Sequence, residues 1–229
     1  MNYDPEKLVL WVDELLLVIN KPAGLPTLPD GYDPAAPHVR SVFQPAFGRL
    51  WVVHRLDKYT SGVLALARSA EAHRSLNTQF DGRQVSKVYH ALVEGSPPWD
   101  GQTSDKALRK DADRMHRTLI DPLKGKRAVT HLRVLRRLER YTLLEARPET
   151  GRTHQIRVHL AGLGFPVAGD RLYGSKAPFP LQTGEDNEWL GLHAWSLAFE
   201  HPATQEKVSF QAPYPEFWMW AIQSEKGMI

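Results

Sequence analysis

The stretch VVHRLDKYTSGVLALARS, residues 52–69, decides how the fold is interpreted. It begins as an apolar strand, gathers three charged residues in HRLD (54–57), and passes through TSG (60–62) into a second apolar run. Short apolar runs bounded by turn residues predict strands over 50–53 and 63–67. Between them, Asp57 has two interpretations that local rules leave open. It either turns the chain, as Asp does before Thr-Ser-Gly, or it is a reactive carboxylate presented by a strand.

The rest of the chain predicts an α+β fold. Strands are expected at 8–19 (two, hinged at Asp13-Glu14), 87–94, 130–135, 141–147, 195–199 and 207–210. Helices are expected from the Ser69 cap to Phe80, at 153–163 with Thr153 as its cap, and at 215–222. The segment 20–45 is rich in Pro and Gly and is predicted to be loop. Many strands joined by hairpins, with few helices, indicate a mixed or antiparallel sheet.

Size and composition exclude several classes of protein. The chain has 229 residues, 42% of them hydrophobic, so it can bury a sizeable core. It has no apolar run long enough to span a bilayer and no signal-peptide pattern at its start, so a cytoplasmic protein is expected. The absence of cysteine excludes disulfides, thiolate zinc sites and a cysteine nucleophile.

A basic belt points to an anionic partner. Residues 106–140 contain twelve Lys/Arg and four acids, a net +8, whereas the whole chain carries +3 and the remainder therefore −5. A cationic segment on an otherwise acidic chain is typical of a polyanion-binding site. A solvated loop and strand face is the simpler alternative.

Two motif interpretations fail on spacing. A kinase catalytic loop also begins His-Arg, but it places Asp directly after Arg and Asn five residues beyond that Asp. Here Leu56 intervenes, and Gly62 stands five residues after Asp57. His154 and His159 are five apart, roughly 140° around a helix, whereas zinc-binding helices use a spacing of four with a Glu between. We therefore expect capping and surface histidines, and no metal site.

Arg152 and Arg157 lie near the start of the helix predicted at 153–163, where the helix dipole favours acids. A carboxylate from elsewhere or an RNA phosphate would compensate them, unless both are simply solvated. Tyr89 within a strand and Lys21 within a loop are explained locally as a core aromatic and a loop lysine.

Several stretches together resemble the RluA-type RNA pseudouridine synthases. The matching pieces span nearly the whole chain in order: NKPAGL (20–25), HRLDKYTSG (54–62), KVYHALVEG (87–95), GKRAVTH (125–131), ETGRTHQIRVHLAGLGFPVAGDRLYG (149–174) and LGLHAWSLAF (190–199). The combination of HRLD with TSG and of GRTHQIR is specific.

The resemblance implies a single catalytic domain over 1–229 with the pseudouridine synthase fold. That fold is a mixed, mostly antiparallel sheet with flanking helices and a central RNA-binding cleft. Because the first predicted strand begins near Leu8, we expect no N-terminal S4 domain of the kind that some relatives carry, and we expect the belt at 106–140 to recognise RNA. No cofactor is required, because uridine and pseudouridine are isomers.

The resemblance also implies roles for individual residues. Asp57 is the expected catalytic carboxylate, Arg157 keeps it ionised through a salt bridge, and Tyr89 packs on the base and is a candidate for proton transfer. Arg55 is expected to face the RNA and to enter the stack that the flipped uridine leaves, and Leu192 to close the pocket. The other expected RNA-binding residues are Arg152, His154, Lys21, Lys126 and Arg127.

These inferences predict an isomerase acting as a monomer on an rRNA or tRNA stem-loop, with no membrane partner. Two other classes remain open at this point. One is a non-catalytic RNA-binding module of the same fold, and the other is a metal-dependent hydrolase of nucleic acid.

Overall fold

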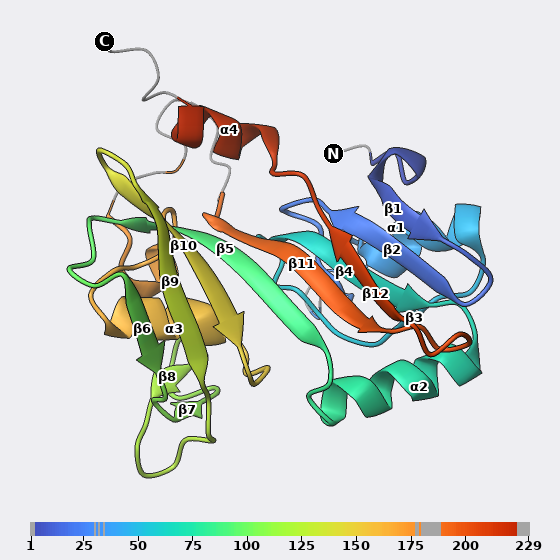
Figure 1. Cartoon of the computed structure of the whole chain (residues 1–229), viewed down its shortest axis with the longest axis horizontal. Coiled ribbons are helices and arrows are strands. Elements are labelled where there is room, and N and C mark those ends of the chain that lie inside the picture. Colours follow the sequence, from blue (N-terminus) through green and yellow to red (C-terminus); the bar gives the residue numbers. More distant parts are fainter. Residues whose placement is uncertain are drawn as a thin grey trace. The chain divides into compact units, whose positions relative to one another are not determined.

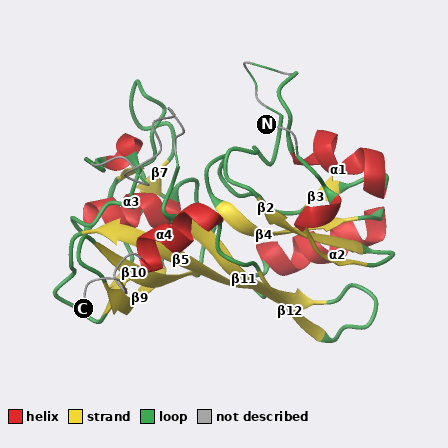
Figure 2. Ribbon diagram, turned by 90° about the horizontal axis from the view of Figure 1, so that it is seen from above, coloured by secondary structure: helices red, strands yellow, loops and turns green. Residues whose placement is uncertain are grey.

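A computed structural model describes residues 3–29, 31, 33, 35–176, 179 and 189–223 of the chain. The chain divides into two compact units. Unit 1 comprises Met1–Lys87 and Ala194–Tyr214, and unit 2 comprises Val88–His193 and Pro215–Ile229. Figures 1 and 2 show the elements of both units. None of the helices in the described ranges is long and apolar enough to span a membrane.

Unit 1 contains strands of the main sheet that pair mostly antiparallel. β1 (Val9–Val12) pairs with β2 (Leu16–Lys21), which pairs with β4 (Ser61–Ala67). β4 also pairs with the short β3 (Trp51–Val52), and β12 (Lys207–Gln211) pairs with β11 (Leu192–Glu200). The strand order is β1-β2-β4-β11. The predicted strands of this unit and the hinge between the first two are confirmed.

β4 forms the centre of this sheet, and all seven of its residues are buried. Gly62 is required at its start. Its φ is +111°, and a Cβ there would overlap the backbone of Ala194 on β11. The glycine that follows Thr-Ser in the opening motif therefore allows two backbones to approach closely. A continuous apolar run marks β4 as a strand that is covered on both faces.

Helix α2 (Ala70–Asp81) covers one part of the unit 1 core. Ser69 caps it by accepting a hydrogen bond from the backbone N–H of Ala72, as predicted. Ala72 and Leu76 pack with residues of β2, β4 and β11 in one hydrophobic cluster. The chain enters this unit through a short 3₁₀ turn, Glu6–Leu8.

The prediction of loop throughout 20–45 is wrong. β2 continues to Lys21, and helix α1 occupies Val39–Phe47. His38 caps α1, because its Nδ1 accepts the Ser41 N–H while Ser41 Oγ accepts the His38 N–H. A histidine cap and a proline inside the helix, Pro45, conceal the helical signal.

In unit 2, four strands of the ten-stranded sheet pair antiparallel in the order β5-β10-β9-β6. These strands are β5 (Ser86–Glu94), β10 (Tyr141–Pro148), β9 (Thr130–Arg137) and β6 (Gly101–Ser104). β7 (Leu108–Arg109) and β8 (Leu119–Ile120) form a separate two-stranded ribbon. The predicted strands at 87–94, 130–135 and 141–147 are confirmed.

Helix α3 (Gln155–Gly162) lies across one face of this sheet in both views (Figures 1 and 2). It begins two residues later than predicted, and its N-cap is His154, with φ 54°, rather than Thr153. A 3₁₀ turn, Arg171–Tyr173, follows it. Helix α4 (Glu216–Gln223) confirms the helix predicted at 215–222. The mostly antiparallel main sheet and its flanking helices are those of the predicted α+β class.

Candidate functional site

Asp57 lies in the loop that joins β3 to β4. β3 ends at Val52, five residues earlier, so no strand presents Asp57 directly. The backbone of Asp57 opens a turn, because its carbonyl accepts the Thr60 N–H at 3.1 Å. Arg55 is exposed and Asp57 half-buried. The local interpretation as a turn is therefore correct for the backbone.

The residue before Asp57 is clamped by Thr27. The backbone N–H of Leu56 donates to Thr27 Oγ1 at 3.2 Å, and the same hydroxyl donates to the Leu56 carbonyl at 2.8 Å. Both residues are buried, so water competes poorly for these bonds. One threonine hydroxyl thus fixes the peptide groups on both sides of the Leu56 Cα.

The residue after Asp57 is clamped by Lys21. Nζ of Lys21 donates to the carbonyls of Pro22, Leu25 and Lys58 at 2.9, 2.8 and 3.1 Å. The carbonyl of Lys58 also accepts the Gly24 N–H at 2.9 Å. Three acceptors match the three donors of a lysine ammonium. The loop at Asp57 is consequently held against the segment that follows β2.

Lys21 differs from both of its sequence-based interpretations. It is the last residue of β2 rather than a loop lysine, and its side chain is 0% exposed, which is incompatible with direct contact to RNA. Burial lowers the pKa of Lys21 to about 7, and the charge of Asp57 opposes that shift. Sequence alone could not reveal this burial, because lysines are rarely enclosed.

His54 anchors the start of the same loop. Its Nε2 accepts the backbone N–H of Ala65 on β4 at 3.0 Å, and its ring stacks on Phe80 of α2 with centroids 4.6 Å apart. Burial, with the charge of Lys87 adding to it, lowers the pKa of His54 to about 3. A neutral imidazole is required here, since a protonated ring has no acceptor to offer Ala65.

Arg157 on α3 forms a buried ion pair with Asp170. Its Nε and one terminal nitrogen donate to the two carboxylate oxygens of Asp170 at 2.7 and 2.8 Å, and the side chains are 11% and 1% exposed. Of the compensations expected for this arginine, a carboxylate from elsewhere is therefore present. Such bidentate pairs fix the plane of the guanidinium group.

Tyr173 extends this cluster. The guanidinium carbon of Arg157 lies 5.1 Å from the centre of its ring. Its hydroxyl oxygen accepts the Thr118 N–H at 3.1 Å and is 2.9 Å from His154 Nδ1. Burial raises the pKa of Tyr173, so the phenol stays protonated at neutral pH. His154 therefore supports the cluster from the N-terminus of α3.

The two histidines of GRTHQIRVH have separate partners. His154 bonds to Tyr173, whereas His159 is fully buried between Thr130 Oγ1 and the Lys106 carbonyl, each at 2.9 Å. The interpretation of His159 as a surface histidine is wrong. It belongs to a buried polar network in which Gln155 Nε2 donates to Thr130 Oγ1 at 2.9 Å.

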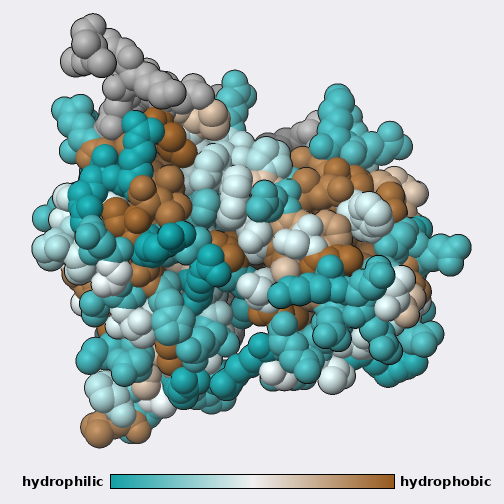
Figure 3. Space-filling model, in the orientation of Figure 1, coloured by the Kyte–Doolittle hydropathy of each residue, from teal (hydrophilic) through white to brown (hydrophobic). Residues whose placement is uncertain are grey.

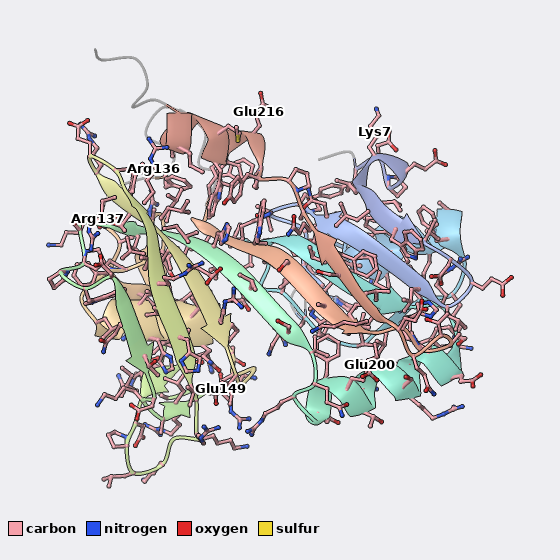
Figure 4. All side chains as sticks on the ribbon, viewed as in Figure 1. Lys7, Arg136, Arg137, Glu149, Glu200 and Glu216 are labelled. Atoms are coloured by element: carbon pink, nitrogen blue, oxygen red, sulfur yellow. The ribbon has the colours of Figure 1, made fainter. Side chains whose placement is uncertain are left out.

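The remaining cationic candidates lie beside the end of β10. Nε of Arg152 donates to the Arg127 carbonyl at 3.2 Å. Arg127 itself pairs with Glu149 at 3.1 Å, and Glu149 also binds His131 at 2.8 Å. Lys126 is exposed. Figure 4 shows Glu149 at this end of β10 and Arg136 and Arg137 towards its other end.

Tyr89 and Leu192 come from two strands. Tyr89 on β5 is opposite Ala146 of β10 and is half-buried. Leu192 begins β11 and is 4% exposed. Both residues belong to strands, which suits side chains that must be placed accurately.

Sequence reasoning missed three residues that support the candidates, namely Thr27, Asp170 and Tyr173. Asp170 and Tyr173 stand in AGDRLYG (168–174), where an acid and an aromatic follow a helix that carries an uncompensated arginine. The uncompensated positive charge on that helix could have pointed to a carboxylate in this segment. Thr27 offers none, because a threonine in a proline-rich loop has no distinctive pattern.

Known proteins resemble this chain over most of its length. Residues 15–162 match the family model described as RNA pseudouridylate synthase. Ribosomal large subunit pseudouridine synthase D of Pseudomonas aeruginosa is 36% identical over 236 residues, covering 96% of this chain and 72% of that protein. The uncharacterized RNA pseudouridine synthase YlyB of Bacillus subtilis is 39% identical, covering 91% of this chain and 69% of that protein.

A solved structure agrees with these matches. Human RNA pseudouridylate synthase domain containing 4 superposes with a TM-score of 0.79 and 27% identity, covering 97% of this chain and 94% of that one. The predicted resemblance and the predicted fold class are thereby confirmed. The chain belongs to the RNA pseudouridylate synthase family.

Proposed function

We propose that this protein is an isomerase that converts uridine to pseudouridine in RNA, with ribosomal RNA of the large subunit as its substrate. The observation that carries the proposal is the pair of clamps on the loop of Asp57, from Thr27 to Leu56 and from Lys21 to Lys58. A carboxylate fixed through both neighbouring residues suits a catalytic group. The relatives named ribosomal large subunit pseudouridine synthase D support the choice of substrate.

The reaction keeps the formula of the nucleoside. The bond from N1 of the base to C1′ of the ribose breaks, a bond from C5 to C1′ forms, and the C5 proton is lost while N1 gains one. No electrons enter or leave. In the proposed mechanism Asp57 acts by attack on the ribose, by attack on the ring, or by removal of a ribose proton.

The other roles follow the family resemblance and are proposed in the same sense. Arg157 keeps Asp57 ionised, and its pair with Asp170 fixes the plane of the guanidinium. Tyr89 packs on the flipped base and moves a proton, and Leu192 closes the pocket. Arg55 fills the stack that the uridine leaves, and its exposure supports that role. Flipping costs a few kcal/mol, and least in loops.

We assign Lys21 a positioning role in place of RNA contact, since it is fully buried. His154 is likewise assigned to holding Tyr173. Arg152, Lys126 and Arg127 remain proposed RNA contacts. We further propose that one copy of the whole chain, 1–229, acts as a single catalytic domain on a stem-loop in the cytoplasm, where bacterial ribosomal RNA is made.

Mapping pseudouridines in total RNA tests the substrate. RNA from a strain lacking the gene is compared with RNA from the parent strain. A site lost from large-subunit rRNA and restored by the intact gene is the expected result. Loss of a tRNA site alone would replace the proposed substrate, and an unchanged map would contradict the activity.

A further inference from the structure

The cations of the basic belt fall into two groups. Five arginines are held by carboxylates: Arg109 by Asp121 and Arg117 by Asp113 at 2.7 Å, Arg137 by Asp100 at 2.8 Å, Arg127 by Glu149 at 3.1 Å and Arg133 by Glu145 at 3.3 Å. Six other cations of the belt have exposed side chains and no ion pair with any residue that the structure describes: Arg114, Lys124 and Lys126 within residues 108–126, the β7–β8 segment, and Lys106, Arg136 and Arg140 outside it. Lys110 of the segment pairs with Asp111 at 3.6 Å.

The base of the β7–β8 segment is fixed to α3 and its surroundings. Leu108 is buried with Ala128 and Val158, and the Thr118 N–H donates to the Tyr173 hydroxyl. Ile120 lies so close to Gly162 of α3 that a Cβ there would overlap its side chain. The segment is therefore anchored to the helix that carries Arg157.

Two aspartates brace the turns of the segment. Oδ1 of Asp113 accepts the backbone N–H groups of Met115 and Arg117, at 3.0 and 3.1 Å. Oδ1 of Asp121 accepts those of Leu123 and Lys124, at 3.0 and 2.9 Å. Each aspartate also pairs with one arginine of the segment. Bracing of this kind is the Asx-turn arrangement.

Each braced turn presents an apolar side chain to solvent. Met115 is 63% exposed and Leu123 is 94% exposed. Met115 stands between Arg114 and His116, and Leu123 directly precedes Lys124. In Figure 3, hydrophobic surface lies at the lower end of the view, where the loop after β7 lies in Figure 1. Single exposed apolar residues are common on protein surfaces, but these two stand beside cations on aspartate-braced turns, and that combination suits contact with a charged partner.

The charge of the segment selects the kind of partner. Its six Lys/Arg against three Asp give a net +3, and two of the three aspartates are occupied by bracing. Phosphates supply the missing anions, and unstacked bases and riboses supply apolar faces, which a regular RNA duplex hides. A protein partner would need an acidic and apolar patch of matching spacing. The described residues give no reason to prefer such a partner.

We propose that the β7–β8 segment is an RNA-docking surface. Arg114 and Lys124 bind phosphates, and Met115 and Leu123 pack against unpaired nucleotides. This proposal rests on the proposed function, because it names the part of the chain that holds the RNA. The proposal assigns phosphate binding to unpaired cations of the basic belt, since arginines already paired with carboxylates bind a phosphate less strongly.

A charge experiment tests the phosphate contacts. The double variant Arg114→Gln/Lys124→Gln is compared with Arg74→Gln/Lys207→Gln, which removes two exposed cations from unit 1. The probe is an unmodified transcript of large-subunit rRNA, titrated between 50 and 300 mM salt. Each lost phosphate contact lowers the slope of log K against log [salt] by about 0.7–0.9. We expect a slope about 1.5 lower for the segment variant and an unchanged slope for the control.

An apolar experiment tests the base contacts. Met115→Ala/Leu123→Ala is compared with Leu135→Ala, an apolar residue of β9 that is 38% exposed. The segment variant should bind the transcript about five- to tenfold more weakly with an unchanged salt slope, while the control matches wild type. All variants keep Asp113 and Asp121, so their melting temperatures should match that of wild type.

The two experiments separate this proposal from the proposed function. If wild type forms pseudouridine and both segment variants bind like their controls, the docking surface is wrong and the activity stands. If the variants weaken binding but wild type forms no pseudouridine, the surface stands and the activity fails. If both segment variants bind RNA as tightly as their controls, the proposal is contradicted. A surface that docks a protein would give this result.

Discussion

Thr27 and Leu56 are joined by two hydrogen bonds through one hydroxyl, which accepts the Leu56 N–H at 3.2 Å and donates to the Leu56 carbonyl at 2.8 Å. The residue in front of the proposed catalytic carboxylate thus has both backbone polar groups fixed by one side chain. Because the partners are 29 positions apart in sequence, this clamp exists only in the folded chain.

Removing the Thr27 hydroxyl tests the clamp. In Thr27→Val the shape is kept, and two buried backbone groups of Leu56 lose their partner, at a cost of about 2–4 kcal/mol. We expect a lower kcat for pseudouridine formation with little change in RNA affinity, and Thr27→Ser should restore most of the rate. Equal rates for the valine and serine variants would show that the hydroxyl does not position Asp57.

Titration of Lys21 predicts a dependence of stability on pH. Burial lowers its pKa from 10.5 to about 7 in the folded chain, so between these values the unfolded chain binds a proton that the folded chain lacks. Stability therefore rises with pH in this window, by at most about 1.4 kcal/mol per pH unit.

Urea unfolding at pH 7 and pH 9 measures this effect. The difference in free energy of unfolding between wild type and Lys21→Met should shift in favour of wild type at the higher pH. A difference that does not vary with pH would contradict a lysine titrating near neutrality.

His54 predicts sensitivity to acid. Its pKa falls from 6.5 to about 3 on folding, so the unfolded chain takes up a proton first as the pH drops. The stability that neutral His54 gives is present above pH 6.5 and is lost progressively towards pH 3. His54→Gln keeps an acceptor for Ala65 and should show a smaller loss between pH 7 and pH 5 in thermal unfolding. His73→Gln on α2 is the control, and equal acid sensitivity of all three proteins would contradict the assignment.

Replacing Asp170 should strongly lower the free energy of unfolding, because its carboxylate pairs with the buried Arg157. Asp170→Asn leaves the Arg157 guanidinium without its buried carboxylate and should cost about 3–5 kcal/mol of stability. The matched control is Asp100→Asn, which breaks the exposed pair with Arg137 and should cost at most about 1 kcal/mol. Urea unfolding of both variants decides the point. Similar small losses would mean that the pair does not fix α3.

Local patterns predicted the strands and α2, because apolar alternation and a serine cap act over a few residues. They failed where the partners of a side chain are brought together only by folding. Lys21 is fixed by carbonyls of 22, 25 and 58, and Arg157 by an aspartate beyond the end of its helix. The loop at Asp57 shows both the success and the failure of local patterns. Its turn was predictable, but the hydrogen bonds from Thr27 and Lys21 that hold it were not. Helix α1 was missed because its cap is a histidine and a proline lies within it.

The most direct test of the central claim compares wild type with Asp57→Asn on one unmodified transcript of large-subunit rRNA. Asparagine keeps the shape and the loop clamps but removes the carboxylate. We predict that pseudouridine formation falls by at least about a hundredfold while RNA affinity stays within about twofold. Turnover near the wild-type rate in the asparagine variant would contradict the role of Asp57 as the catalytic carboxylate.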